Sequence, residues 1–153
     1  MPAPAFITLC YSYMAAPTPA PDYLTLHHRD DLGVLLVRWQ RPLSGLEVQA
    51  GYEAIATHAV ACRSRYWLLD YRGRSVPTED DTNWFLTQFI PPLAGRLGGR
   101  VYLAFLMAPS HLSAIDQEDG VPLASDTHCH LRMFTEEGLA IAWLARRQHY
   151  ESA

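Results

Sequence analysis

A short apolar segment, Tyr66–Asp70, leads directly into a polar loop and then into the start of a helix. The segment is almost entirely apolar up to its last residue, which predicts a strand covered on both faces. Thr78 stands where a helix N-cap is expected, with Asp81 three residues later. Because ligands of open α/β sheets bind at the carboxyl ends of strands, the loop 71–78 is where this chain would carry a site.

Strand patterns recur on both sides of this segment. Residues 23–28 alternate between apolar and polar side chains, and residues 34–39 are almost continuously apolar. The turn 29–33 between them contains Asp and Gly, so the two predicted strands form an antiparallel hairpin. Residues 101–107 are apolar throughout and predict a central strand, whereas residues 130–134 predict an edge strand.

Helix patterns lie between these predicted strands. Ser44 begins the first helix, with Glu47 at the capping-box position, and apolar residues at spacings of three and four run to about Cys62. Thr78 begins the second helix, which contains two successive prolines at 91–92. A proline removes a backbone donor and clashes with the preceding turn, so we expect a kink or a break there.

Two further helices complete the predicted pattern, a short one at 110–118 and a last one that Thr135 opens. The resulting order is β-β-α-β-α-β-(α)-β-α. A hairpin followed by alternating strands and helices predicts an α/β fold, with a single mixed sheet of four to five strands and helices packed on it.

The chain has a length of 153 residues, which suits one domain. We expect that domain at 22–150, preceded by an N-terminal extension, 1–21, that is flexible or loosely docked because it is rich in Pro and Ala. Two other interpretations of the extension stay open. Residues 5–16 resemble a signal core without its basic region, and Met14 could be the native start.

Composition excludes several classes of protein. A net charge of −4 offers no attraction to phosphate backbones, which argues against a nucleic-acid partner. No stretch approaches the roughly 20 apolar residues of a membrane span. The three cysteines, Cys10, Cys62 and Cys129, have no CxxC spacing, which is typical of reduced thiols and favours a cytoplasmic location.

Four segments together carry a resemblance to a known family. They are 37–41 (VRWQR), 67–72 (WLLDYR), Trp84, and 89–92 (FIPP) before a Gly-rich turn and an apolar strand. From about Tyr23 to Gln148, the chain resembles small bacterial single-domain proteins with a SpoIIAA-like (STAS-like) fold. Proteins of this kind mostly have no described function.

In anti-sigma-factor antagonists of that fold, a Ser or Thr at the start of the helix after the third strand is phosphorylated. This chain departs from the pattern, because Asp70 is followed by Tyr and Arg, and the nearest hydroxyls belong to Ser75 and Thr78. A phosphate on either would lie near Arg72, Arg74 and a helix N-terminus. Thr78, however, already has a sufficient role as a helix cap.

The loop after the third predicted strand is the leading candidate site. Its candidate ligand- or partner-binding residues are Asp70, Tyr71, Arg72, Arg74, Ser75 and Thr78. Arginine forks beside free helix N–H groups suit a small anion. The alternative is structural: Asp70 pairs with Arg72 or caps a turn, and Arg74 is solvated. No base or nucleophile stands nearby, so we expect no catalytic residue, no cofactor and no enzyme.

A second cluster follows at residues 128–130. On a strand, His128 and His130 point to one face and could hold a zinc ion, with a third ligand from His27, His28 or His111. Surface histidines without a metal are the simpler interpretation. Cys129 would point to the opposite face, which argues against a thiol–imidazole pair within the strand.

Aromatic residues in the proline-containing helix allow two uses. Trp84, Phe85 and Phe89 could form the surface of a homodimer, or they could line an apolar pocket between helix and sheet. The leading hypothesis is a non-enzymatic regulatory or binding module that contacts a protein partner or a small anionic ligand through the loop 70–78. The alternatives are a carrier or enzyme for a small apolar ligand in such a pocket, and a metal-binding protein that uses the His128/His130 pair.

Overall fold

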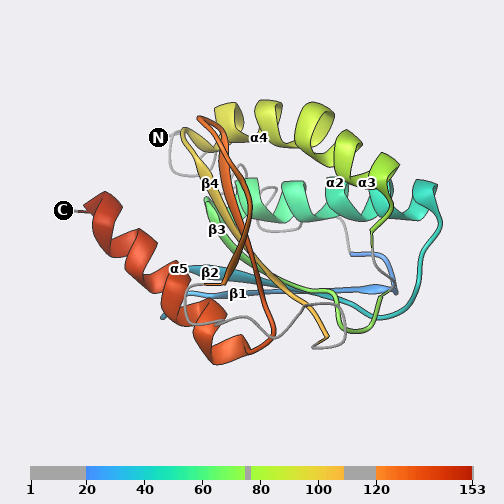
Figure 1. The fold of residues 1–153 in the computed structure, drawn as a ribbon. Helices are drawn as coiled ribbons and strands as arrows, with labels where there is room; N and C mark the ends of the chain where they lie inside the picture. Colours follow the sequence, from blue (N-terminus) through green and yellow to red (C-terminus); the bar gives the residue numbers. More distant parts are fainter. Residues whose placement is uncertain (1–19, 75–76, 109–119, 153) are drawn as a thin grey trace, which may run out of the picture.

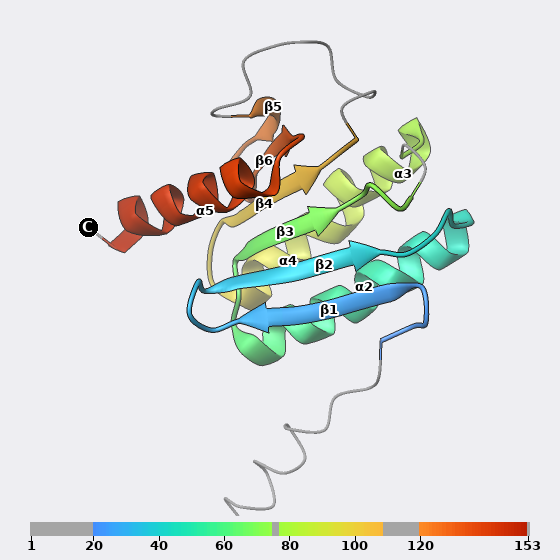
Figure 2. The same ribbon diagram turned by 90° about the horizontal axis from the view of Figure 1, so that it is seen from below.

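Helices cover both faces of a mixed six-stranded sheet (Figures 1 and 2). The computed structural model describes residues 20–74, 77–108 and 120–152. Its strands are β1 (Leu24–Arg29), β2 (Val34–Trp39), β3 (Tyr66–Asp70), β4 (Val101–Leu106), β5 (Val121–Ser125) and β6 (Cys129–Phe134). Its helical segments are α2 (Gly45–Cys62), α3 (Glu79–Trp84), the π-helical turn η1 (Phe85–Phe89), α4 (Ile90–Leu97) and α5 (Glu137–Ser152).

The sheet has the order β1-β2-β3-β4-β6-β5. β2, β3, β4 and β6 are parallel, and an antiparallel strand flanks them at each edge. Consecutive parallel strands are joined by α2 and by the segment α3–η1–α4, as parallel pairing requires. The carboxyl ends of β3, β4 and β6 therefore lie together at one end of the sheet.

Each face of the sheet has its own apolar core. α2 and α4 pack on one face, where Trp39, Ile55 and Trp67 are among the fully buried side chains. α5 packs on the other face, against side chains such as Leu68 and Phe134. None of the helices in the described ranges is long and apolar enough to cross a membrane.

Two predicted helix starts are confirmed. The Ser44 hydroxyl accepts from the Glu47 backbone N–H while the Glu47 carboxylate accepts from the Ser44 N–H, which completes the capping box of α2. The Thr78 hydroxyl accepts from the Asp81 N–H at 3.1 Å and begins α3. The Thr78 cap fixes where the loop after β3 ends.

The prolines at 91–92 distort the helix but do not break it. They fall in the first turn of α4, directly after the π-helical turn, in which the Ile90 N–H donates to the Phe85 carbonyl. Because prolines have no N–H, the carbonyls one turn earlier lose their usual partners, and the wider turn accommodates this loss. The predicted distortion therefore lies before the prolines and takes the form of a π turn.

The α/β class and the mixed sheet are confirmed, whereas two strand predictions are wrong. β5 was not expected, and it makes the sheet one strand larger than the predicted four to five. β6 is not an edge strand, because it lies between β4 and β5. The predicted short helix at 110–118 lies outside the described residues, as do Ser75 and most of the predicted extension 1–21.

Candidate functional site

Asp70, at the end of β3, is the centre of a saturated ion cluster. Arg72 donates to its carboxylate from the backbone N–H at 3.0 Å, from Nε at 3.0 Å and from Nη2 at 2.8 Å. Arg38 on the neighbouring strand donates from Nε at 3.1 Å. Burial acts to raise the pKa of Asp70, but these hydrogen bonds outweigh it and leave the pKa below its ordinary value.

The Asp70 cluster matches the structural alternative considered for this loop. The Asp70 side chain is 8 % exposed, whereas Arg38 and Arg72 are 57 % and 45 % exposed. Both guanidinium groups already donate to the one carboxylate, and the positive charge that remains lies on side chains that reach solvent. Water can therefore solvate that charge, and the cluster does not need an anionic ligand to complete it.

Beyond Arg72 the chain turns back toward the core. Gly73 lies so close to β2 that a Cβ there would stand 2.6 Å from the Trp39 carbonyl oxygen. The Arg74 backbone N–H donates to the Tyr71 carbonyl and closes the turn. Only a residue without a side chain fits this approach, and the approach directs Arg74 inward.

Arg74 is buried, so the expectation that it is solvated is wrong. Its side chain is 3 % exposed. Its guanidinium carbon lies 4.8 Å from the centre of the Trp39 ring and 4.5 Å from that of Tyr71. Arginine stacks well on aromatic faces, and this stacking replaces the solvent that a surface arginine would have.

Two buried tyrosine hydroxyls lie beside Arg74. Tyr52, from α2, and Tyr71 are hydrogen-bonded to each other through their hydroxyls. Burial raises the pKa of both phenols, with Arg74 opposing the shift, so both hold their protons at neutral pH. The pair contributes donors and no negative charge.

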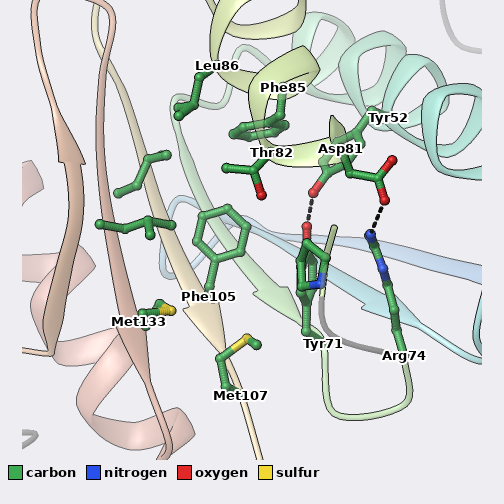
Figure 3. A pocket seen from close by; sticks show the side chains of 13 residues that line it. Tyr52, Tyr71, Arg74, Asp81, Thr82, Phe85, Leu86, Phe105, Met107 and Met133 are labelled. Carbon is green, nitrogen blue, oxygen red and sulfur yellow. Dashed lines mark hydrogen bonds and ion pairs between the residues drawn. The ribbon is translucent and has the colours of Figure 1, made fainter. Parts of the chain in front are cut away.

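These groups form one end of a cavity between α3 and the sheet, which we call the α3–sheet cavity (Figure 3). Its volume is about 370 Å³. The polar end holds Tyr52, Tyr71, Arg74, Asp81 and Thr82. The rest of the wall is apolar and comes from four elements and their flanking loops; it comprises Pro77, Phe85, Leu86, Phe105, Met107, Leu123, Leu131 and Met133.

Thr78, one of the two residues proposed for phosphorylation, does not line this cavity. Thr78 is exposed, and its hydroxyl accepts the capping hydrogen bond described above. Ser75 lies outside the described residues. Arg74, expected beside a phosphate on either hydroxyl, has its guanidinium packed on Trp39 and Tyr71 instead.

The histidine cluster has the wrong surroundings for a cation. His128 is exposed and His130 is buried, with Arg132 Nε and Arg147 Nη2 at its two ring nitrogens. Burial and the neighbouring arginines lower the pKa of His130 to about 4. Across residues 20–74, 77–108 and 120–152, no three His, Cys, Asp or Glu side chains are grouped to hold a metal ion.

Cys129 is an inert thiol in this position. It is buried, and burial together with Asp126 raises its pKa to about 12. A thiol with so high a pKa carries almost no thiolate at neutral pH, and the thiolate is the nucleophile.

The aromatic residues of the proline-containing helix belong to the core, so Phe85 and Phe89 do not form a dimer surface. Both are buried and pack around Tyr52, with ring centres 4.8 and 5.1 Å away. Trp84 is half-buried and also faces Tyr52. Phe85 additionally lines the α3–sheet cavity, whereas Trp84 and Phe89, which the alternative hypothesis also placed around a pocket, do not.

Comparisons with protein-family models, with curated proteins and with solved structures find no match. The resemblance to SpoIIAA-like proteins therefore stays a prediction from sequence. Sequence reasoning also missed several lining residues, including Tyr52, Asp81, Phe105, Met107 and Met133. One signal was available, since Phe105 and Met107 end an apolar strand at the same edge of the sheet as Tyr71.

Proposed function

We propose that this protein is a non-enzymatic binding module that holds a small, mainly apolar molecule in the α3–sheet cavity. The observation that carries the proposal is the cavity itself. A volume of about 370 Å³ falls within the range of small-molecule sites, at its lower end. Such sites are mostly apolar with a few polar groups that orient the ligand, and this wall has that composition.

The position and lining of the cavity support the same proposal. It lies at the carboxyl ends of β3 and β4, where α/β sheets bind their ligands. Met107 and Met133 contribute flexible thioethers, which adapt their shape to a bound apolar group. The sequence hypothesis placed the contact on the surface of the loop after β3, and the proposal moves it to the inner side of that loop.

Binding without catalysis is supported by the chemistry of the lining. The two tyrosines hold their protons, the Asp81 carboxylate is paired with Arg74, and no His or Cys side chain lines the described wall. The proposal keeps the predicted cytoplasmic location. It also keeps the predicted SpoIIAA-like fold, supported by the hairpin β1–β2 and the two parallel crossovers that follow it.

Titration with the neutral fluorophore N-phenyl-1-naphthylamine tests the proposal. The fluorophore is expected to bind the wild-type protein with one saturable site. Leu86→Trp fills the cavity with a large side chain and should weaken binding about tenfold or more. Leu46→Trp is the matched control, because Leu46 is 83 % exposed on α2 and should leave binding unchanged.

Thermal unfolding of both variants establishes that they are folded. If the wild-type protein binds no fluorophore, or if Leu86→Trp binds it as tightly as Leu46→Trp does, the proposed function is wrong.

A further inference from the structure

Arg74 has no carboxylate within hydrogen-bond distance in the described chain, and its Nη1 has no acceptor there. Its nearest carboxylate oxygen, Asp81 Oδ2, lies 3.9 Å from Nη2, which is too far for a hydrogen bond. Among the described residues, three buried side-chain nitrogens lack a hydrogen-bond partner: Trp39 Nε1, Arg74 Nη1 and Arg147 Nε. Only Arg74 also lines the α3–sheet cavity.

A buried charged donor without an acceptor is costly, so such groups are rare unless a ligand completes them. The contrast with Asp70 is direct, since that carboxylate accepts four hydrogen bonds. The ring faces of Trp39 and Tyr71 hold the guanidinium in place but accept no conventional hydrogen bond from Nη1.

The tyrosine pair adds a second donor at the same end. Each hydroxyl carries one hydrogen. Only one of the two hydrogens lies between Tyr52 and Tyr71, so the second is left for another acceptor. One guanidinium N–H and one hydroxyl O–H therefore meet at the polar end of a cavity whose other walls are apolar (Figure 3).

We infer that the α3–sheet cavity binds an apolar molecule with a carboxylate head, and that Arg74 binds this carboxylate. The inference rests on the proposed function and adds the chemical class of its ligand. A carboxylate has two acceptor oxygens, which the Arg74 fork and the tyrosine hydroxyl would share. The apolar part would lie against Phe105, Met107 and Met133.

Asp81 favours a head with a single negative charge. Its carboxylate partly compensates Arg74 from 3.9 Å, and it would repel a phosphate that carries close to two charges. Among the described lining residues the polar end has no second arginine, and the sequence contains no lysine. A phosphate head therefore lacks the cations that it needs.

Matched eight-carbon ligands test the inference on wild-type protein stripped over a hydrophobic resin. Octanoate, 1-octanol and octyl phosphate are each titrated against bound N-phenyl-1-naphthylamine at pH 7. Octanoate should bind about tenfold or more tightly than 1-octanol, since a charge-assisted hydrogen bond separates them. Octyl phosphate should bind less tightly than octanoate.

Two variants locate the head group. Arg74→Met should abolish the preference for octanoate over 1-octanol. Asp81→Asn removes the competing carboxylate while keeping the backbone N–H that Thr78 caps, so octanoate should bind several-fold more tightly. Asp81 is partly exposed, and its substitution therefore keeps the test available if Arg74→Met does not fold.

The outcomes separate the two proposals. If 1-octanol binds wild-type protein as tightly as octanoate does, the inference is wrong and the proposed function stands. If octyl phosphate binds more tightly than octanoate, the carboxylate assignment is wrong. If the preference for octanoate survives in Arg74→Met, Arg74 does not bind the carboxylate of octanoate. If the fluorophore and all three ligands fail to bind, the proposed function itself is wrong.

Discussion

Asp70 and Arg74 stand four residues apart on one loop, and both are buried, yet their ionic surroundings are opposite. Asp70 accepts four hydrogen bonds from two arginines whose side chains reach solvent. Arg74 has one carboxylate at 3.9 Å, and its Nη1 has no acceptor in the described chain. The first centre is complete within the protein, whereas the second is not.

This difference indicates which part of the loop carries a functional group. The exposed arginines, which look available, already share the Asp70 carboxylate and hold the loop to β2 and β3. The arginine that is hidden from solvent, Arg74, keeps a guanidinium nitrogen without an acceptor in the described chain and faces a cavity. The outer end of the loop, where Asp70 and Arg72 lie, therefore has a structural role. The inner end, where Arg74 lies, is assigned to ligand binding.

Gly73→Ala should have the largest effect on stability, because Gly73 lies between the Asp70 cluster and Arg74. The new Cβ would stand 2.6 Å from the Trp39 carbonyl oxygen, so the backbone of the loop must move. We expect the free energy of unfolding to fall by about 2–3 kcal/mol, measured by urea denaturation. Gly95→Ala is the control, since nothing lies within 4 Å of its new Cβ, and no loss of stability at Gly73→Ala would refute the close approach.

Asp70→Asn should destabilise the protein by about 1–2 kcal/mol. The neutral amide keeps the shape of the carboxylate but loses its charge-assisted bonds to Arg72 and Arg38. The loss stays moderate because both arginines can return to water. Urea denaturation measures the change, and binding of octanoate should be unaffected; a selective loss of octanoate binding would move the anion site to the outer end of the loop.

Arg74→Met should increase the free energy of unfolding of the ligand-free protein. Methionine fills much of the same space and removes a buried charge without a hydrogen-bonded acceptor, so we expect a gain of about 1 kcal/mol in unfolding free energy. The aromatic stacking that is lost reduces this gain. A loss of more than about 1 kcal/mol would mean that Arg74 is a structural group like Asp70.

The pH dependence of stability should give the smallest effect. The pKa of Asp70 is lower in the folded protein than its ordinary value of about 3.9, so the unfolded chain takes up the proton first. The stabilisation is therefore fully present above about pH 4 and is lost as pH falls through the folded pKa. In urea denaturation at pH 7, 5, 4 and 3, the gap between wild type and Asp70→Asn should close only below about pH 4.

A second buried group titrates near this range and is common to both proteins. Burial lowers the pKa of His130 to about 4, so its destabilising effect develops as pH falls from about 6.5. The comparison of wild type with Asp70→Asn cancels it. A gap that closes already between pH 7 and pH 5 would contradict the assignment to Asp70.

Local signals in the sequence were sufficient for most elements. Ser44 and Thr78 indicate the starts of two helices, because side-chain capping depends only on neighbouring residues. β5 was missed because it contains Pro122 and is largely exposed, so neither composition nor apolar pattern indicates a strand. Edge strands tolerate proline, and their existence depends on the partner strand.

The sequence indicated where the site lies, but not which of its arginines is buried and which is exposed. The pairing of Asp70 with Arg72 was anticipated, because the two residues are close in sequence. The burial of Arg74 depends on Trp39, 35 positions earlier in the chain, and on the close approach at Gly73. Arginine is almost always exposed, so nothing in the local sequence indicated that this one lies inside.

Nuclear magnetic resonance of the arginine side chains tests the division of the loop most directly. The guanidinium signals of Arg38, Arg72 and Arg74 are followed in wild-type protein while octanoate is added, with Arg74→Met providing the assignment. The account predicts that the Arg74 signal shifts to saturation while those of Arg38 and Arg72 stay in place. A saturable shift at Arg38 or Arg72, with Arg74 unmoved, would contradict it.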